Sequence, residues 1–152
     1  MSKVAEERDF LGVFGVLWRG DALLLGENQR RLSPGQDPVP VFDLPGGEVE
    51  AGETLEEALV REWREETGCA IQLGGFLFVQ EGIRRIDGRR SHVWRSFFFE
   101  VRTQEEPFPE GELRSLLWCP RRDLGQVLTA PYHQSFLDFL DKGGCYQRGS
   151  WG

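Results

Sequence analysis

A chain of 152 residues with 25 acidic and 18 basic side chains carries a formal net charge of −7, which disfavours non-specific binding to long nucleic acid. This length is enough for one compact domain, no run is apolar enough to span a membrane, and the charged N-terminus lacks an apolar signal region. We therefore expect one domain over residues 1–152. Three cysteines without a C-x-x-C pair predict a reducing, cytoplasmic compartment, and two histidines argue against a zinc site or a Ser-His triad.

The predicted elements, in chain order, alternate strands with two helices. Two strands (11–18 and 22–26) form a hairpin, a polar loop (29–40) is a candidate lid, and a short strand (41–44) leads into a helix (54–67). Two strands (72–83 and 93–102) are joined around Asp87 and Gly88, and an acidic loop (103–112), a strand (113–119) and a helix (132–141) follow. The glycine-rich tail (143–152) is expected to be partly mobile. This order predicts an α+β protein with one mixed sheet between two helices.

The helix over 54–67 has clear start and stop signals. Thr54 and Glu57 have the spacing of a capping box, and Gly68 stands where a left-handed residue would end the helix. Each helical residue turns by about 100°, so three carboxylates lie within about 60° of an apolar stripe. The stripe contains Leu55, Ala58 and Leu59, and the carboxylates are Glu62, Glu65 and Glu66.

An apolar stripe that continues as carboxylates is costly to bury unless a cation neutralises it. Divalent cations that prefer oxygen ligands are the natural partners, so a metal site is favoured over a solvated acidic helix face. The loop Leu44–Gly47 before the helix contains two glycines, which let the backbone approach a ligand closely. Its carbonyl groups are candidate metal ligands, and the alternative is an ordinary turn. The chain has neither a P-loop nor a strand followed by G-x-G-x-x-G.

The same region resembles the signature of the Nudix hydrolases. The pattern G-x5-E-x7-R-E-x-x-E-E-x-G is matched by Gly47, Glu53, Arg61, Glu62, Glu65, Glu66 and Gly68. The resemblance implies an α/β/α sandwich with a mixed central sheet between helices. It also implies a hydrolase that cleaves a diphosphate bond in a nucleoside diphosphate linked to another group. Trp63 and Cys69 stand where the family usually has aliphatic residues, which affects packing and leaves the chemistry unchanged.

Carried over to this chain, the resemblance assigns Glu62, Glu65, Glu66 and the Gly47 carbonyl as ligands of Mg²⁺ or Mn²⁺. Arg61 matches the arginine that supports the signature, and its azimuth points away from Glu62, towards the loop or Glu53. Glu53 is expected to fix the loop and to approach a water bound to the metal.

A further acidic group outside the signature is often needed in the family. Glu112 is the candidate, with Glu110 and Glu100 as alternatives and a solvated loop carboxylate as the simpler explanation. The implied mechanism is attack on one phosphorus by a metal-activated water. Glu62 is the first choice of general base and Glu112 the alternative.

The substrate is not specified by the signature. The window Ile83–Ile86 carries neither the proline nor the tyrosine that marks ADP-ribose or dinucleoside polyphosphate specificity in relatives. We expect a nucleoside triphosphate cleaved to a monophosphate and pyrophosphate. Nucleoside diphosphate sugars, ADP-ribose and dinucleoside polyphosphates are the alternatives. Candidate substrate contacts are Arg30 and Arg84, with Arg31 and Arg85 beside them, and the rings of Phe42 and Phe14, although such residues are more often surface charges and core.

Two alternative functions and the oligomeric state are not decided by these residues. A nucleotide-sensing module without catalysis is disfavoured because every carboxylate of the signature is present. An RNA 5′-end pyrophosphatase is disfavoured by the acidic balance, so a small nucleotide is the expected partner and polymeric nucleic acid is not. The oligomeric state cannot be read from the residues, but relatives are often dimers, which makes a homodimer one option.

Overall fold

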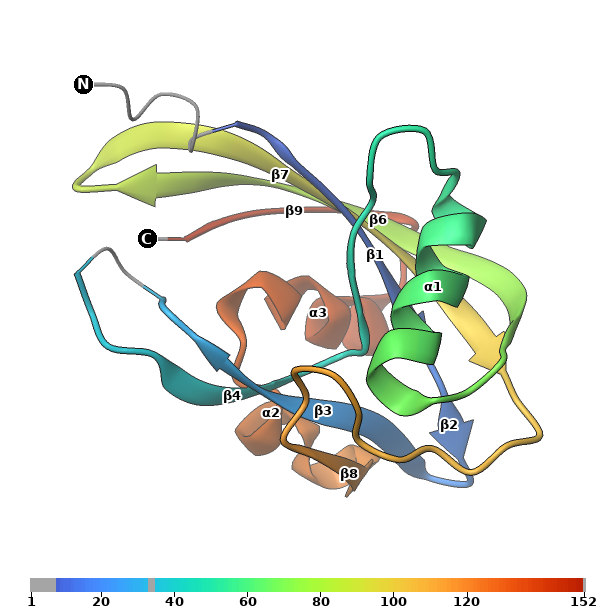
Figure 1. Ribbon diagram of the computed structural model, residues 1–152. Helices are drawn as coiled ribbons and strands as arrows, with labels where there is room; N and C mark the ends of the chain where they lie inside the picture. Colours follow the sequence, from blue (N-terminus) through green and yellow to red (C-terminus); the bar gives the residue numbers. More distant parts are fainter. Residues whose placement is uncertain (1–7, 33–34, 152) are drawn as a thin grey trace.

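The computed structural model describes residues 8–32 and 35–151 (Figure 1). The strands in this part are β1 (Phe10–Val16), β2 (Trp18–Arg19), β3 (Ala22–Arg30), β4 (Val39–Asp43), β5 (Gly46–Glu48), β6 (Gln72–Ile86), β7 (Arg89–Arg102), β8 (Ser115–Pro120) and β9 (Tyr146–Trp151). The α-helices are α1 (Leu55–Thr67), α2 (Leu124–Val127) and α3 (Gln134–Lys142), with single 3₁₀ turns at Arg121–Asp123 and Pro131–His133. None of the helices in these two ranges is long and apolar enough to cross a bilayer.

The strands form two sheets where the sequence predicts one. The larger sheet has the order β5-β1-β7-β6-β9 and is mixed, because β1 runs parallel to β7 and β9 parallel to β6. In the second sheet β3 pairs antiparallel with β2, β4 and β8. In the second sheet, Leu23, Leu24 and Leu25 of β3 are all fully buried, so both faces of this strand are covered.

The core has two clusters on opposite faces of the sheets. Val13 and Phe14 are neighbours on β1, and their side chains enter different clusters because successive strand residues face opposite ways. One cluster packs against α3 and includes Phe78 and Phe98, whose rings stack at 4.2 Å. The other packs against α1 and includes Trp63. The strands therefore lie between helices, and the α+β fold with α/β/α layers agrees with the sequence prediction.

Helix α1 begins and ends as its sequence predicts. The Thr54 side chain accepts a hydrogen bond from the Glu57 amide, the Glu57 carboxylate accepts one from the Thr54 amide, and Gly68 follows with a φ of 73°. The buried stripe differs from the expected one, because it runs through Ala58, Leu59, Trp63 and Thr67. This stripe lies further round the helix than expected. The large ring of Trp63 takes the centre of the interface, and the acidic residues lie at its edge.

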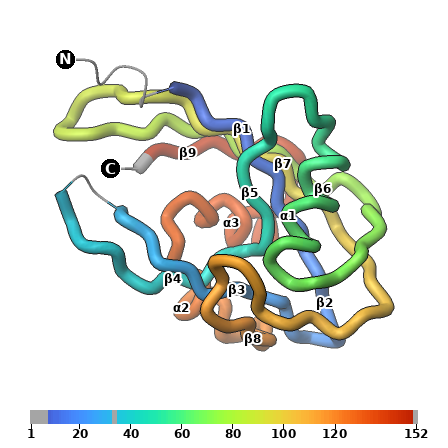
Figure 2. Tube along the Cα trace, viewed as in Figure 1, coloured from blue at the N-terminus to red at the C-terminus, as the bar shows by residue number. Residues whose placement is uncertain are grey.

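The β3–β4 hairpin and the β6–β7 hairpin project from the same side of the molecule (Figure 2). In the β6–β7 hairpin, Asp87 and Gly88 have φ values of 54° and 77°, which is the geometry of a two-residue turn with both residues left-handed. In the tail, Tyr146–Trp151 forms β9 against β6, and the Tyr146 hydroxyl donates to Glu81 at 2.7 Å. The glycine content of the tail did not indicate this strand.

Candidate active site

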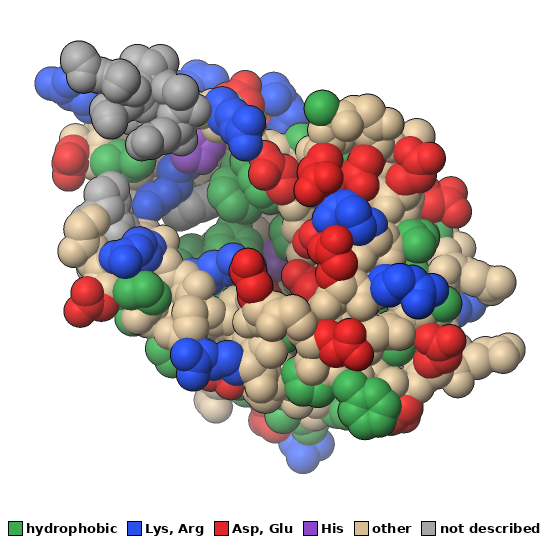
Figure 3. All heavy atoms as spheres, in the orientation of Figure 1, with side chains coloured by type: hydrophobic (Ala, Val, Ile, Leu, Met, Phe, Trp, Pro, Cys, Tyr) green, Lys and Arg blue, Asp and Glu red, His purple; other side chains and the backbone are tan. Residues whose placement is uncertain are grey.

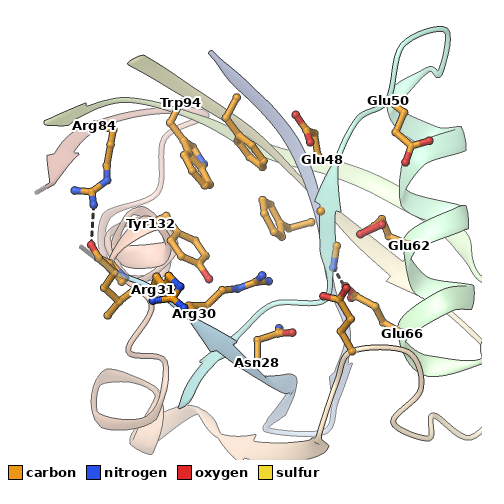
Figure 4. A pocket seen from close by; sticks show the side chains of 17 residues that line it. Asn28, Arg30, Arg31, Glu48, Glu50, Glu62, Glu66, Arg84, Trp94 and Tyr132 are labelled. Carbon is orange, nitrogen blue, oxygen red and sulfur yellow. Dashed lines mark hydrogen bonds between the residues drawn. The ribbon is translucent and has the colours of Figure 1, made fainter. Parts of the chain in front are cut away.

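A cavity of about 420 Å³ opens between α1 and the ends of the β3–β4 and β6–β7 hairpins (Figure 4). It is lined by Phe10, Phe14, Asn28, Arg30, Arg31, Leu32, Gly46, Gly47, Glu48, Glu50, Glu62, Glu66, Arg84, Trp94, Glu112, Pro131 and Tyr132. Carboxylates lie at the end formed by α1 and β5, while aromatic rings and arginines lie at the other end. The space-filling view shows the same division, with acidic side chains on one side of a hollow and basic ones on the other (Figure 3).

Glu66 lies deepest in the acidic end. Its Oε1 accepts a hydrogen bond of 3.1 Å from the Gly46 amide at the start of β5. Burial, and then the charge of Glu62, raise the pKa of Glu66 to about 9. A carboxyl group held in this way keeps its proton at neutral pH unless a cation binds beside it.

Glu62 faces Gly47 across the junction of α1 and β5. Its side chain is 15% exposed, and burial raises its pKa although Arg61 opposes the change. A Cβ at position 47 would collide with the Glu62 carboxylate, which explains the glycine. The Gly47 backbone and the Glu62 carboxylate can therefore face the same small volume.

Arg61 anchors the loop before α1. Its Nε and Nη2 donate to the Glu53 carboxylate at 2.6 and 3.0 Å, and Nη2 also donates to the Glu48 carbonyl at 3.1 Å. The hydrogen bond from Arg61 lowers the pKa of Glu53 to about 2. These contacts with the loop and Glu53 match the prediction. The prediction that Arg61 points away from Glu62 is wrong, because the long side chain curls back and Nη1 donates to Glu62 at 2.8 Å.

Glu65 lies apart from the other two carboxylates. Its side chain is 57% exposed, it does not line the cavity, and its Oε1 accepts a 3.3 Å hydrogen bond from Arg61. Across residues 8–32 and 35–151, no group of three or more His, Cys, Asp or Glu side chains is already arranged to hold a metal ion. Arg61 Nη1 contacts both Glu62 and Glu65, so a cation that bound these oxygens would take the place of the guanidinium.

The remaining predicted residues divide between the cavity and its surroundings. Glu112, Arg30, Arg84 and Phe14 line it, whereas Arg61 and Glu53 stand behind the acidic end. Glu110 is placed by its backbone, whose amide donates to the Glu66 carbonyl, and neither it nor Glu100 lines the cavity. Phe42 also lies outside the lining and packs against the core cluster next to α3. Alternation along β4 explains this, because Asp43 contacts Tyr132 and Asn28, which line the cavity, and its neighbour Phe42 faces the other way.

The aromatic end contains residues that the sequence reasoning missed. The rings of Phe10 and Trp94 stack at 3.8 Å, and Trp94 and Tyr132 stack at 5.4 Å. Trp94 shares its strand face with the buried Phe98, four residues along β7. Period-two spacing from Phe98 is the signal that could have placed Trp94 on this face.

A buried carboxylate supports this end from below. Asp43 is 2% exposed and accepts hydrogen bonds from Tyr132 Oη at 2.6 Å and Asn28 Nδ2 at 2.9 Å, with Arg30 Nη2 at 3.6 Å. Burial raises the pKa of Asp43, and it also raises the pKa of Tyr132. The network orients Asn28 and Tyr132, both of which face the cavity.

A family model described as the NUDIX domain matches residues 9–140. Because this match covers most of the chain, the chain belongs to the Nudix family, as its signature indicates. The fold is similar to that of the crystal structure of the mutator protein MutT from Bacillus halodurans, with a TM-score of 0.70 and 20% identity. That likeness covers 93% of this chain and 88% of the other, and it concerns the fold alone.

Three curated relatives differ in the substrates that their names state. The CTP pyrophosphohydrolase of Escherichia coli (strain K12) is 30% identical over 78% of this chain and 82% of its own length. A Bacillus subtilis (strain 168) protein provisionally named an 8-oxo-dGTP diphosphatase is 52% identical over 39% of this chain. The ADP-ribose pyrophosphatase of Methanocaldococcus jannaschii is 43% identical over 55% of this chain. The matched regions span only 40% and 45% of the lengths of the last two.

Proposed function

We propose that this protein is a pyrophosphohydrolase that uses Mg²⁺ or Mn²⁺ and cleaves a nucleoside triphosphate to a monophosphate and pyrophosphate. The observation that carries the proposal is the division of one cavity into two ends. Glu62, Glu66 and Gly47 face one end, and Trp94 stacks with its aromatic neighbours at the other. A nucleotide has the same two parts, a phosphate chain that needs cations and a base that stacks on rings.

The residues present fit a divalent cation. Glu62 and Glu66 bring two carboxylates to the same end of the cavity, and burial is the main cause that raises the pKa of each. The collision that a Cβ at Gly47 would cause keeps the backbone next to the same oxygens. Glu62, Glu66 and the Gly47 carbonyl would hold the ion, and Glu65 would join them once its contact with Arg61 is released. The ion would offset the charge that develops on the phosphoryl oxygens.

The protein's own side chains supply the rest of the chemistry. Glu62 accepts the proton of the attacking water, and its raised pKa brings it closer to the working pH of a general base. Glu112, which lines the same cavity from the loop before β8, is the alternative base. Arg61 positions Glu62 through its hydrogen bonds to the loop and Glu53.

The relatives support a nucleoside triphosphate as the first choice of substrate. Two of the names, the CTP pyrophosphohydrolase and the 8-oxo-dGTP diphosphatase, refer to nucleoside triphosphates. The similarity to an ADP-ribose pyrophosphatase makes a nucleoside diphosphate linked to another group the second choice of substrate. A cavity of about 420 Å³ is near the lower end of the range for small-molecule sites, which favours one nucleoside over two.

The test is a panel of nucleotides incubated with Mg²⁺ or Mn²⁺, with products identified by phosphorus NMR. A nucleoside triphosphate should give a monophosphate and pyrophosphate. Glu66→Gln should lose most of this turnover and keep its fold, because the amide oxygen can still accept from the Gly46 amide. Near-normal metal-dependent turnover in Glu66→Gln would reject the site. Tight nucleotide binding without any cleavage by the wild type would reject the enzyme in favour of a sensor.

A further inference from the structure

The larger sheet ends on one side in a strand whose outer backbone groups have no partner. β9 is the edge strand beyond β6 in this sheet (Figure 1). The Val79 amide donates to the Cys145 carbonyl at 2.9 Å, which starts a parallel ladder in which the odd-numbered residues of β9 bond to β6. The amides and carbonyls of Tyr146, Arg148 and Ser150 therefore point outward. All three residues are exposed, and no other described strand pairs with β9.

β9 lacks the features that usually protect an edge strand. Proline, lysine and β-bulges commonly keep such an edge from pairing with another strand. The six residues of β9 include no proline or lysine, and their register with β6 runs without a shift from Tyr146 to Trp151. The start of the strand is also fixed, because Gln147 Nε2 donates to the Gly143 and Gly144 carbonyls at 2.9 and 3.0 Å. An incoming strand would meet a preformed edge.

The side chains at this edge favour a second copy of the same strand. Tyr146 is 51% exposed, its hydroxyl donates to Glu81 at 2.7 Å, and Arg148 lies in register with the same glutamate. The hydrogen bond from Tyr146 lowers the pKa of Glu81, and the charges of Arg95 and Arg148 act in the same direction. The edge thus presents a ring, a carboxylate and a guanidinium together. Two such edges complement each other when they run antiparallel.

We propose that two copies of this chain associate through their β9 strands, which pair antiparallel about a two-fold axis at Gln147. In this register Tyr146 of each copy lies opposite Arg148 of the other, on the same face of the joined sheets. The guanidinium can then pack on the ring and reach the Glu81 carboxylate to which that ring is bonded. An axis at Arg148 is disfavoured, because it would place the two guanidinium groups directly opposite each other.

A two-fold pairing of β9 also closes the assembly. The opposite edge of the sheet is β5, which has three residues and packs against α1. Pairing of β9 with β5 of another copy would leave a free edge at each end, and such head-to-tail contacts build filaments unless they close into a ring. The contact between two β9 strands uses the same surface of both copies and leaves neither β9 edge open.

The dimer is expected to be weak. Two six-residue strands form an interface smaller than the roughly 1,200 Å² that stable complexes bury. We therefore expect a Kd between about 1 µM and 1 mM. Neither Tyr146 nor Arg148 lines the cavity, so association through β9 is independent of the proposed function.

The test compares the association of the wild type, Arg148→Pro and Ser150→Pro in the absence of nucleotide. Sedimentation equilibrium is measured from about 1 µM to about 1 mM. Both prolines remove an outward amide and spare the bonds to β6. Only Arg148 lies in the central pairs, because Ser150 would lie opposite Gly144, outside the strand. Far-UV circular dichroism and nucleotide turnover of the same samples verify the fold.

The wild type should dimerise reversibly. Arg148→Pro should raise Kd at least about tenfold, because two hydrogen bonds between the copies are lost and two carbonyls stay unpaired. Ser150→Pro should stay within about threefold of the wild type. If proline alters the circular dichroism spectrum, Arg148→Glu and Ser150→Glu give the same comparison with every amide kept. Arg148→Glu should then dissociate the dimer, because it places a carboxylate opposite Tyr146 and near Glu81.

Two results would overturn the proposal. A wild type that is monomeric over the whole concentration range would leave this edge to an extended peptide of another protein. Equal dissociation constants for the variants at 148 and 150 would reject pairing about Gln147. Absence of nucleotide cleavage by the wild type would instead reject the proposed function, and the association through β9 would be unaffected by that result.

Discussion

Replacing Gly47 with alanine places a methyl group against the Glu62 carboxylate. The new Cβ would lie 2.8 Å from Glu62 Cδ, whereas carbon atoms in contact prefer about 3.5–4.0 Å. The carboxylate must therefore retreat by about 1 Å, and a displacement of that size in a catalytic group can lower activity by about 100-fold. The carboxylate is the free end of a flexible side chain, and Gly47 does not have a positive φ, so the backbone can keep its course.

The variant should lose activity and keep its stability. We expect kcat/KM for the preferred nucleotide to fall by about 100-fold, while Tm stays within about 2 °C of wild type. Gly75→Ala is the matched control, because a Cβ there meets no atom within 4 Å and the φ is not positive. The Gly47 carbonyl survives the substitution, so the assay isolates the position of Glu62. Activity of Gly47→Ala within about threefold of Gly75→Ala would refute the reasoning.

Two further predictions concern the aromatic end and the core beside it. Trp94→Leu should raise KM by about tenfold with little change in kcat, since stacking of one base is worth about 1–3 kcal/mol. Trp118→Leu, outside the cavity lining, should leave KM unchanged, and an equal KM for both variants in steady-state kinetics would contradict the stacking role. His133 is fully buried, and burial lowers its pKa from 6.5 to about 3. Between these pH values the unfolded chain binds a proton that the folded chain does not, so stability falls by about 1.4 kcal/mol per pH unit as pH drops. His133→Phe should remove this contribution in urea unfolding from about pH 4.5 to 6.5, and an unchanged pH slope would show that His133 is not its source.

Helix α1 could be predicted from sequence because its determinants are local. Thr54, Glu57 and Gly68 specify the two ends by contacts within a few residues. The division into two sheets could not be predicted from sequence. It depends on pairing between β1 and β7 and between β6 and β9, and these strands are distant along the chain. The alternation of apolar and polar residues predicts that a strand exists, but it does not predict which strand lies beside it.

The candidate site shows the same limit. Glu62 and Glu66 belong to one helix, so their spacing placed both at one end of the cavity. Trp94, Tyr132 and Asn28 come from separate elements that only the tertiary fold brings together, and they were missed. Glu65 was grouped with its neighbours by azimuth, yet it is exposed because Trp63 shifts the buried face of α1.

Trp63 also constrains which residues the chain can carry at position 15. Its indole Nε1 donates to the Pro45 carbonyl at 3.1 Å, and a Cβ at Gly15 would lie 2.5 Å from the same nitrogen. Any side chain at position 15 therefore excludes the indole, while a smaller residue at 63 would tolerate one. While the indole occupies this space, residue 15 has to be glycine, and alanine there becomes tolerable only when position 63 carries a smaller side chain. Relatives with an aliphatic residue at 63 should accordingly be free to vary at 15, so the two positions should change together across the family.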